Sequence, residues 1–174
     1  MQSLNAQYGP DVPQWVPPSS GRFKCNINAA FYKTFKRTGI GVCLRDDHGT
    51  FVLAKVLQYD QVYSVVVGEA LGLYHAIQWM HDMHFDNVDF ELDSKITRDA
   101  FHSCKTDVTE FGNTIDECRV RFFSSFTNSR VEFIRRQANA AAHALAREAT
   151  SLASPNIYYV IPQCIESIII NEML

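Results

Sequence analysis

The fold is decided by the stretch FKCNINAAFYKTFKRTGIGVCLRDDHGTFVLAKVL, residues 23–57. Apolar and polar side chains alternate over residues 23–28, which is the period of a half-buried β-strand. Residues 39–45 and 50–57 predict a second and a third strand, and the Asp-Asp-His-Gly sequence at 46–49 is typical of the turn between them. These segments therefore predict an antiparallel meander.

The remainder of the chain switches between helical and strand periodicity. Apolar side chains three and four residues apart predict a helix over residues 69–84. Alternation returns over 87–93, where Val88, Phe90 and Leu92 face one way and the three intervening acids face the other. Further elements are expected in the order helix, helix, strand, helix, at residues 94–102, 109–126, 130–135 and 139–151. Strands mixed with helices in this order predict an α/β domain in which helices pack on the faces of a mixed sheet.

The chain of 174 residues is long enough for one domain and short for two. Residues 1–21 hold most of the prolines and show no hydrophobic periodicity, so an extended leader or linker is expected there. The folded domain is predicted over residues 22–153. The last segment, 154–174, is expected to form a C-terminal arm whose apolar residues 165–170 pack on a sheet edge or a helix.

Composition places the chain among soluble globular proteins. Hydrophobic residues make up 47% of it, and 16 Lys and Arg against 19 Asp and Glu give a formal net charge of -3. These values exclude a disordered tail, a collagen-like repeat and a disulfide framework. They also argue against a protein that holds nucleic acid by bulk positive charge.

Cysteine spacing and hydropathy give expectations about the compartment. The five cysteines are widely spaced and form no C-x-x-C pair, which favours reduced thiols in an intracellular, cytoplasmic or nuclear setting and argues against a structural zinc site. No apolar run reaches the length of about 18 residues that spans a membrane, so no membrane partner is expected. Residues 1–12 lack the pattern of a secretory signal.

Six short pieces of the chain carry a resemblance to a known family: residues 24–31, 39–46, 68–73, 90–95, 135–139 with 143–146, and 161–165 with 171–173. In this order and spacing they resemble the ribonuclease H type 1 superfamily. More narrowly, they are similar to plant ribonuclease H-like domains related to the C-terminal domain of retrotransposon reverse transcriptases. The resemblance covers residues 15–174 and implies a mixed five-stranded sheet, three antiparallel strands followed by parallel ones, with helices on both faces.

The resemblance also implies a chemistry. Family members are endonucleases that hydrolyse the RNA strand of RNA–DNA hybrids with two Mg²⁺ ions, held by four acidic side chains. The matching catalytic positions in this chain are Asn28, Glu69, Asp93 and His143, and the implied metal ligands are Asn28, Glu69 and Asp93. In the family's active pattern the first and fourth positions are aspartates, and here neither is an acid.

This departure predicts impaired hydrolysis. Two Mg²⁺ ions bring four positive charges, whereas Glu69 and Asp93 supply only two negative ones. Asn28 offers a neutral carbonyl oxygen, and the ring nitrogen of His143 suits Mn²⁺ or zinc better than Mg²⁺. We therefore expect Mg²⁺, or Mn²⁺ in its place, to bind weakly or not at all.

Each site residue also has a purely structural interpretation. Glu69 is expected at the start of a helix, where the helix dipole favours a carboxylate. Asp93 ends a strand and either caps the next helix or leaves that role to Ser94. Asn28 fits a solvated strand residue, and His143 fits a surface histidine on the alanine-rich helix.

Four residues are predicted to contact nucleic acid: Asn26, Asn139, Arg135 and Arg136. The two arginines stand just before the last predicted helix, where they can meet backbone phosphates, although a solvated surface explains them equally well. We find no basic protruding loop with interleaved aromatic residues in the sequence. Tight binding of a hybrid by this domain alone is therefore not expected.

The remaining polar clusters favour structural roles. His75, His81 and His84 are spaced by six and three residues rather than by the four that place two imidazoles on one metal. This spacing favours a solvated helix flank. Asp46 and Asp47 fit turn chemistry better than metal binding.

The sequence thus predicts a monomeric ribonuclease H-like domain that binds an RNA–DNA hybrid or another nucleic acid and whose hydrolase activity is impaired. Two other functions stay open. One is a catalytically silent nucleic-acid-binding domain, and the other is a domesticated protein-interaction module.

Overall fold

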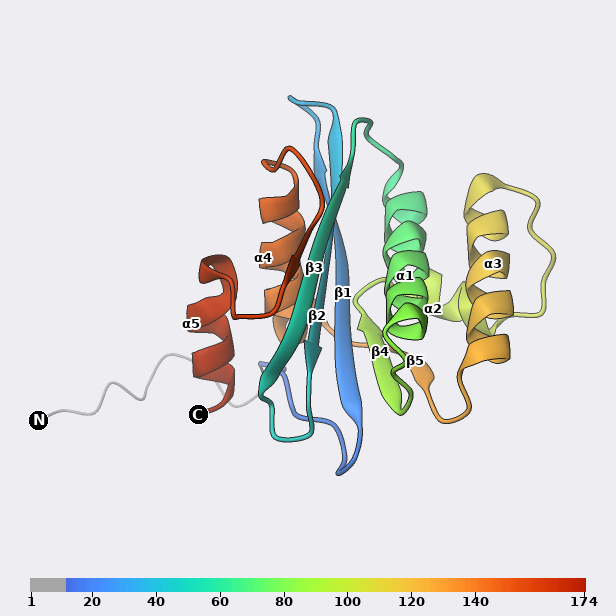
Figure 1. Ribbon diagram of the computed structural model, residues 1–174. Coiled ribbons are helices and arrows are strands. Elements are labelled where there is room, and N and C mark those ends of the chain that lie inside the picture. Colours follow the sequence, from blue (N-terminus) through green and yellow to red (C-terminus); the bar gives the residue numbers. More distant parts are fainter. Residues whose placement is uncertain (1–11) are drawn as a thin grey trace, which may run out of the picture.

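The computed structural model describes residues 12–174, in which a six-stranded mixed sheet has helices on both faces (Figure 1). The strand order across the sheet is β5-β4-β1-β2-β3-β6, with bounds β1 (Phe23–Tyr32), β2 (Arg37–Arg45), β3 (Phe51–Tyr59), β4 (Val88–Leu92), β5 (Arg130–Phe133) and β6 (Asn156–Tyr158). The pairs β1–β2 and β2–β3 are antiparallel, whereas β4 runs parallel to both β1 and β5. The predicted α/β class with a mixed sheet is confirmed.

Helices cover the two faces unequally, with bounds α1 (Val65–Asp82), α2 (Lys95–His102), α3 (Glu110–Ser125), α4 (Ala140–Ala149) and α5 (Gln163–Glu172) and a 3₁₀ turn η1 (Arg136–Asn139) before α4. The main core lies between α1 with its neighbour α3 and one face of the sheet. On the other face α4 packs against β1, β2 and β3, and α5 packs on α4 (Figure 1).

Close packing of α4 on β2 places the site. A Cβ added at Gly41 would lie 2.4 Å from Ala146 N and 2.6 Å from Ala142 O, so only glycine permits this approach. Gly41 is the register partner of Asn28 on β1. The alanine-rich helix and the glycine together therefore bring α4 against the part of β1 that carries Asn28.

The start of α1 corrects one prediction. The helix begins at Val65, four residues before Glu69, and the Ser64 side chain caps it by accepting from Val67 N at 3.4 Å. Three consecutive valines, 65–67, have low helix propensity and hid this start in the sequence. Glu69 therefore lies in the second turn, and the helix dipole no longer accounts for it.

The C-terminal arm adds an element that the sequence did not predict. β6 pairs antiparallel with β3 and raises the number of strands from five to six. It is three residues long, too short for alternation to reveal it. On α5, Ile165 and Ile169 are fully buried in the apolar cluster that α4 forms with β2 and β3.

The N-terminal segment packs on the same face as α4. Trp15 is buried there, and its Nε1–H donates to Asn26 Oδ1 at 2.9 Å. Of the predicted leader, residues 1–11 lie outside the described residues. Among residues 12–174, no helix has the length and apolarity needed to cross a membrane.

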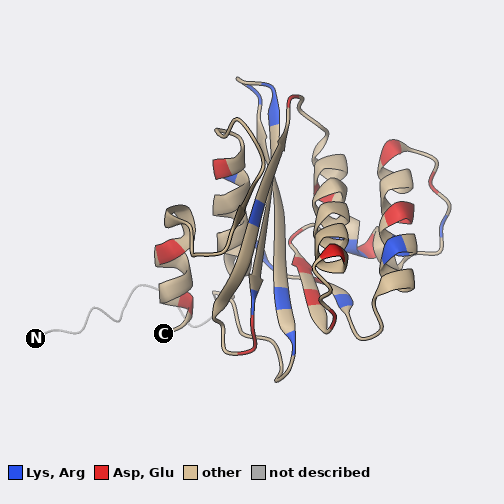
Figure 2. Cartoon of the chain, viewed as in Figure 1, with Lys and Arg blue, Asp and Glu red and all other residues tan. Residues whose placement is uncertain are grey.

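The β1–β2 hairpin contradicts the expectation that no basic loop with aromatic residues protrudes. It projects at one end of the sheet (Figure 1) and carries basic stretches (Figure 2). Lys33, Phe35 and Lys36 are exposed at its tip, where Lys36 N–H donates to Lys33 O at 3.2 Å. Residues 29–38, between the first two expected strands, show no pattern that predicts this hairpin.

Candidate functional site

A cleft of about 670 Å³ lies between the N-terminal part of α1, the end of β4 and α4. It is lined by all four residues that were matched to the family's acidic positions: Asn28, Glu69, Asp93 and His143. They come from β1, α1, the residue after β4, and α4. The topology thus brings together four side chains that are far apart in the sequence.

Three of these residues are joined by hydrogen bonds through His143. Its Nε2 lies 2.7 Å from Asp93 Oδ2, and its Nδ1 lies 2.9 Å from Asn28 Nδ2. An amide nitrogen is a donor, so Nδ1 accepts and Nε2–H donates to the carboxylate, which describes a neutral imidazole. The bridge is sheltered, because the His143 and Asp93 side chains are only 13% and 11% exposed. We call this the Asn28–His143–Asp93 bridge. Asn28 is 1% exposed, so its interpretation as a solvated strand residue is wrong.

Glu69 stands beside this bridge as a buried carboxyl group. Burial raises its pKa to about 8, and the nearby Asp93 carboxylate adds to the shift. The backbone N–H of Ala29 and the positive charge of Arg136 oppose the rise. Glu69 Oε2 is buried and has no hydrogen-bond partner among the described residues. Near pH 7 this group is therefore mostly protonated.

Two arginines that line the cleft are exposed to solvent, Arg136 on η1 and Arg147 on α4. Arg136 was predicted from the sequence. Arg147 was not, although it follows His143 by four residues on one helix, a spacing that places both on the same face. The exposed Lys95 also lines the cleft. With Glu69 protonated, one carboxylate faces three cations, so the cleft is not an acidic pocket.

The next residue, Ser94, decides whether Asp93 caps helix α2. Ser94 is the N-cap of α2, and its Oγ accepts from Thr97 N at 3.3 Å. Asp93 therefore does not cap the helix. Its carboxylate is directed to His143 instead.

Two residues predicted to contact nucleic acid are buried, Asn26 and Asn139, each 1% exposed. Asn26 accepts from Trp15 and donates through Nδ2 to Glu91 Oε2 at 3.2 Å. Asn139 Nδ2 donates to Ile27 O at 2.9 Å and ties η1 to β1. In these positions neither side chain reaches a ligand, because the surrounding protein covers both amides.

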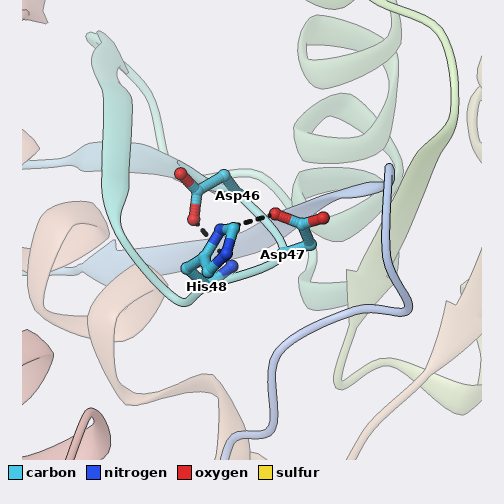
Figure 3. Close-up of side chains that lie close together, drawn as sticks. All are labelled: Asp46, Asp47 and His48. Carbon is cyan, nitrogen blue, oxygen red and sulfur yellow. Dashed lines mark hydrogen bonds and ion pairs between the residues drawn. The ribbon is translucent and has the colours of Figure 1, made fainter.

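The turn between β2 and β3 contains a second polar cluster, Asp46, Asp47 and His48 (Figure 3). Asp46 Oδ1 accepts from the backbone N–H groups of His48 and Thr50, both at 2.9 Å, as expected for turn chemistry. The turn follows Arg45, the register partner of Lys24, so about four residues of β1, roughly 13 Å, separate it from Asn28. We assign no metal to this cluster.

His75 corrects the prediction of a solvated helix flank. Its Nε2 lies 2.5 Å from Tyr59 Oη, and burial lowers its pKa to about 4, with a smaller contribution from the charge of Lys55. His81 and His84 are exposed. The three histidines therefore have different environments and form no common site.

Comparisons with known proteins agree with this architecture. A family model described as reverse transcriptase-like matches residues 26–149. The ribonuclease H1 of Halobacterium salinarum NRC-1 has a TM-score of 0.65 at 20% identity, covering 74% of this chain and 97% of that chain. The N-terminal ribonuclease H domain of a Mycobacterium tuberculosis protein has a TM-score of 0.63 at 17% identity, covering 74% and 93%.

A third solved structure, LC11 ribonuclease H1 in complex with an RNA/DNA hybrid, has a TM-score of 0.64 at 18% identity and covers 74% of this chain and 96% of that chain. At these identities the likeness establishes a common fold. No curated protein matches the sequence significantly.

Proposed function

Because this chain belongs to the reverse transcriptase-like family, we propose that it is a ribonuclease H-like domain that binds RNA–DNA hybrids and hydrolyses them poorly or not at all. The link to plant retrotransposon-derived domains is part of this proposal and rests on the sequence motifs alone.

The observation that carries the proposal is the Asn28–His143–Asp93 bridge. It uses both ring nitrogens of His143 and one oxygen of Asp93 in contacts within the protein. A cation at Asp93 would have to compete with the His143 hydrogen bond. The bridge engages the amide nitrogen of Asn28. The carbonyl oxygen of this side chain is neutral and offers an ion no charge.

The donor set does not fit a centre of two divalent ions. Such a centre brings four positive charges into the cleft, where Asp93 and Glu69 are the only carboxyl groups among the lining residues and burial raises the pKa of Glu69 to about 8. Glu69 Oε2 is buried and has no hydrogen-bond partner among the described residues, so this oxygen is available to bind a single ion. We therefore infer weak or absent binding of Mg²⁺ or Mn²⁺, and we route no reaction step through a metal.

Binding of nucleic acid is supported by the charge around the cleft. Arg136 and Arg147 line it and are exposed, and Arg135 is exposed immediately before η1. Guanidinium groups suit phosphate oxygens because they donate two parallel hydrogen bonds. LC11 ribonuclease H1, which has a similar fold, was solved in complex with an RNA/DNA hybrid, and this supports the choice of a hybrid as the ligand.

Hydrolysis is tested with a labelled RNA–DNA hybrid in Mg²⁺ and in Mn²⁺. We expect the native protein to cut no faster than Asp93→Asn, and the double variant Asn28→Asp/His143→Asp to gain at least about 100-fold, because two restored carboxylates stabilise the bound ions. Asn28→Asp alone tests the first position. Cleavage by the native protein well above Asp93→Asn would overturn the claim of impairment.

Binding is tested by fluorescence anisotropy of the same hybrid without divalent ions. Arg136→Gln/Arg147→Gln is expected to weaken binding and to lower the salt slope by about 2, since two phosphate contacts are lost. Lys105→Gln, on the exposed loop between α2 and α3, is the control. If the native protein binds no nucleic acid, the domesticated protein-interaction module becomes the better explanation.

A further inference from the structure

The β1–β2 hairpin extends the cleft with groups that the cleft itself lacks. The wall of the cleft includes residues 28–31 of β1, and the strand continues through Tyr32 into the turn. From Asn28 to Tyr32 the strand advances about 13 Å, or roughly four base steps at 3.4 Å each. A nucleic acid seated in the cleft and continuing along β1 would therefore reach the hairpin.

Two aromatic rings stand together at the hairpin. Tyr32 and Phe35 have ring centroids 4.9 Å apart and planes tilted by 31°. The two residues are 43% and 67% exposed, so a large part of each ring remains accessible to a ligand. Exposed rings of this kind offer a platform on which unpaired bases stack, whereas bases in a duplex are already stacked on one another.

Positive charge surrounds the rings. Lys33 and Lys36 are exposed, and neither makes an ion pair among residues 12–174. Arg37 is partly engaged, because it donates to Leu152 O at 2.6 Å and pairs with Asp60 at 3.3 Å. Residues 22–45 contain no Asp or Glu, so the hairpin has no negative side chain of its own that would repel a phosphate.

From this combination we infer that the β1–β2 hairpin binds a single-stranded extension of the hybrid that occupies the cleft, with its bases on Tyr32 and Phe35 and its phosphates at Lys33 and Lys36. The inference rests on the proposed function and adds a substrate class to it: hybrids with a single-stranded overhang rather than blunt ones. Aromatic stacking gives this preference without base-specific contacts.

The rings also have a local role, because their contact across the turn stabilises the hairpin. That role predicts a change in stability and no dependence on the end of the nucleic acid. The two roles are therefore separated by comparing overhang and blunt hybrids in one variant, with urea unfolding as the check on folding.

The test uses the full chain and labelled hybrids that are blunt or carry about eight unpaired nucleotides, within the range that binding grooves cover. We expect Phe35→Ala to weaken binding of the overhang hybrid about tenfold and of the blunt hybrid less than about twofold. The control is Phe123→Ala, because Phe123 is 69% exposed on α3, close to the 67% of Phe35.

The lysines are tested by Lys33→Gln/Lys36→Asn, where asparagine suits the φ of 52° at position 36. The salt slope of overhang binding is expected to fall by about 1.4, or 0.7 for each phosphate contact on a single strand. Equal affinity for overhang and blunt hybrids, or equal effects of Phe35→Ala and Phe123→Ala, would overturn the inference and leave the proposed function standing.

A free single strand of the same length separates the remaining outcomes. Binding of that strand through Phe35, with no binding of the blunt hybrid, would support the hairpin site and overturn the proposed hybrid binding. Failure of the native protein to bind any of the three probes would overturn both.

Discussion

The polar face of strands β1 and β4 has two ends, which share one alternating sequence pattern but differ in how their charged groups are paired. The neighbouring parallel strands β1 and β4 direct alternate polar side chains to the face that carries α4: Lys24, Asn26 and Asn28 on β1, and Asp89, Glu91 and Asp93 on and just after β4. At one end these groups are paired and covered. At the other end Asn28 and Asp93 line the cleft and are linked through His143.

At the covered end each carboxylate has a cation. Lys24 Nζ lies 3.0 Å from Glu91 Oε1, and Asp89 Oδ1 lies 2.6 Å from Arg22 and 2.7 Å from Arg130. Burial tends to raise the pKa of Asp89, but the hydrogen bonds from Arg130 and Arg22 outweigh it and hold the pKa below its ordinary value. Asp89 therefore stays charged, whereas burial raises the pKa of Glu91 although the charge of Lys24 opposes the rise. Both carboxylates are tied to neighbouring cations and serve the fold.

At the cleft end the position on β1 is Asn28, and no lysine stands there. Burial and the Asp93 carboxylate then govern Glu69, whose pKa rises to about 8. An aspartate at position 28 would add a third carboxylate to this pair, and without bound cations the repulsion would raise pKa values further. Asparagine avoids that repulsion, and His143 links Asn28 to Asp93 by hydrogen bonds within the protein. The cleft therefore holds less negative charge than three carboxylates would give it, although Glu69 Oε2 still lacks a hydrogen-bond partner among the described residues.

The largest expected effect removes a charge at the covered end. Glu91→Ala leaves Lys24 buried without its carboxylate, so we expect a loss of about 4 kcal/mol in the free energy of unfolding. Asp93→Ala in the cleft removes one hydrogen bond to a neutral histidine and should cost about 1 kcal/mol. Urea unfolding at pH 7 measures both. Equal losses would mean that the two ends do not differ as described.

The next effect concerns Glu69 and depends on pH. Its pKa is about 8 in the folded protein against an ordinary 4.5, so between these values the folded state binds more protons than the unfolded state and stability falls as pH rises. Glu69→Gln removes this loss while keeping a carbonyl acceptor. We expect the variant to be more stable than the native protein by roughly 2–3 kcal/mol at pH 9 and by little at pH 4.5.

Thermal and urea unfolding over this pH range provide the measurement. The comparison between the two ends supplies the control, because Asp89 has its pKa lowered and stays ionised throughout the window. A native protein whose stability does not decline between pH 5 and pH 9 relative to Glu69→Gln would show that Glu69 is ionised at neutral pH.

Much of this contrast was accessible from the sequence, and one part was not. Alternation correctly placed Val88, Phe90 and Leu92 in the core and directed the intervening acids to the opposite face. Motif order brought Asn28 to the same cleft as the other matched positions. These inferences succeed because strand period and element order are local properties of a sequence.

The part that was missed depends on contacts between distant segments. Asn26 and Asn28 look equivalent at period two, and both are 1% exposed, yet Asn26 is bound by Trp15 whereas Asn28 lines the cleft. Likewise, nothing local distinguishes His75, which meets Tyr59 on β3, from the exposed His81 on the same helix. Period-two and helical patterns report which face a residue occupies, but not which segment covers that face.

The smallest expected change in the free energy of unfolding concerns Trp15, the residue that covers Asn26. Trp15 Nε1–H donates to Asn26 Oδ1, and the guanidinium of Arg45 lies 3.5 Å from the centre of a Trp15 ring. Trp15→Phe keeps an aromatic face for Arg45 but leaves the buried Asn26 oxygen without its donor, so we expect a loss of about 1 kcal/mol. Val16→Ala, next to it and exposed, should leave the free energy of unfolding unchanged.

Trp15→Phe also tests whether the covered end of the polar face contributes to hybrid binding. If Trp15 is what separates Asn26 from solvent, Trp15→Phe should lower stability without changing the affinity for a hybrid, because Trp15 does not line the cleft. A loss of hybrid affinity that matches the loss of stability would instead make the covered end part of the binding surface. Unfolding and anisotropy measurements on one preparation decide between these results.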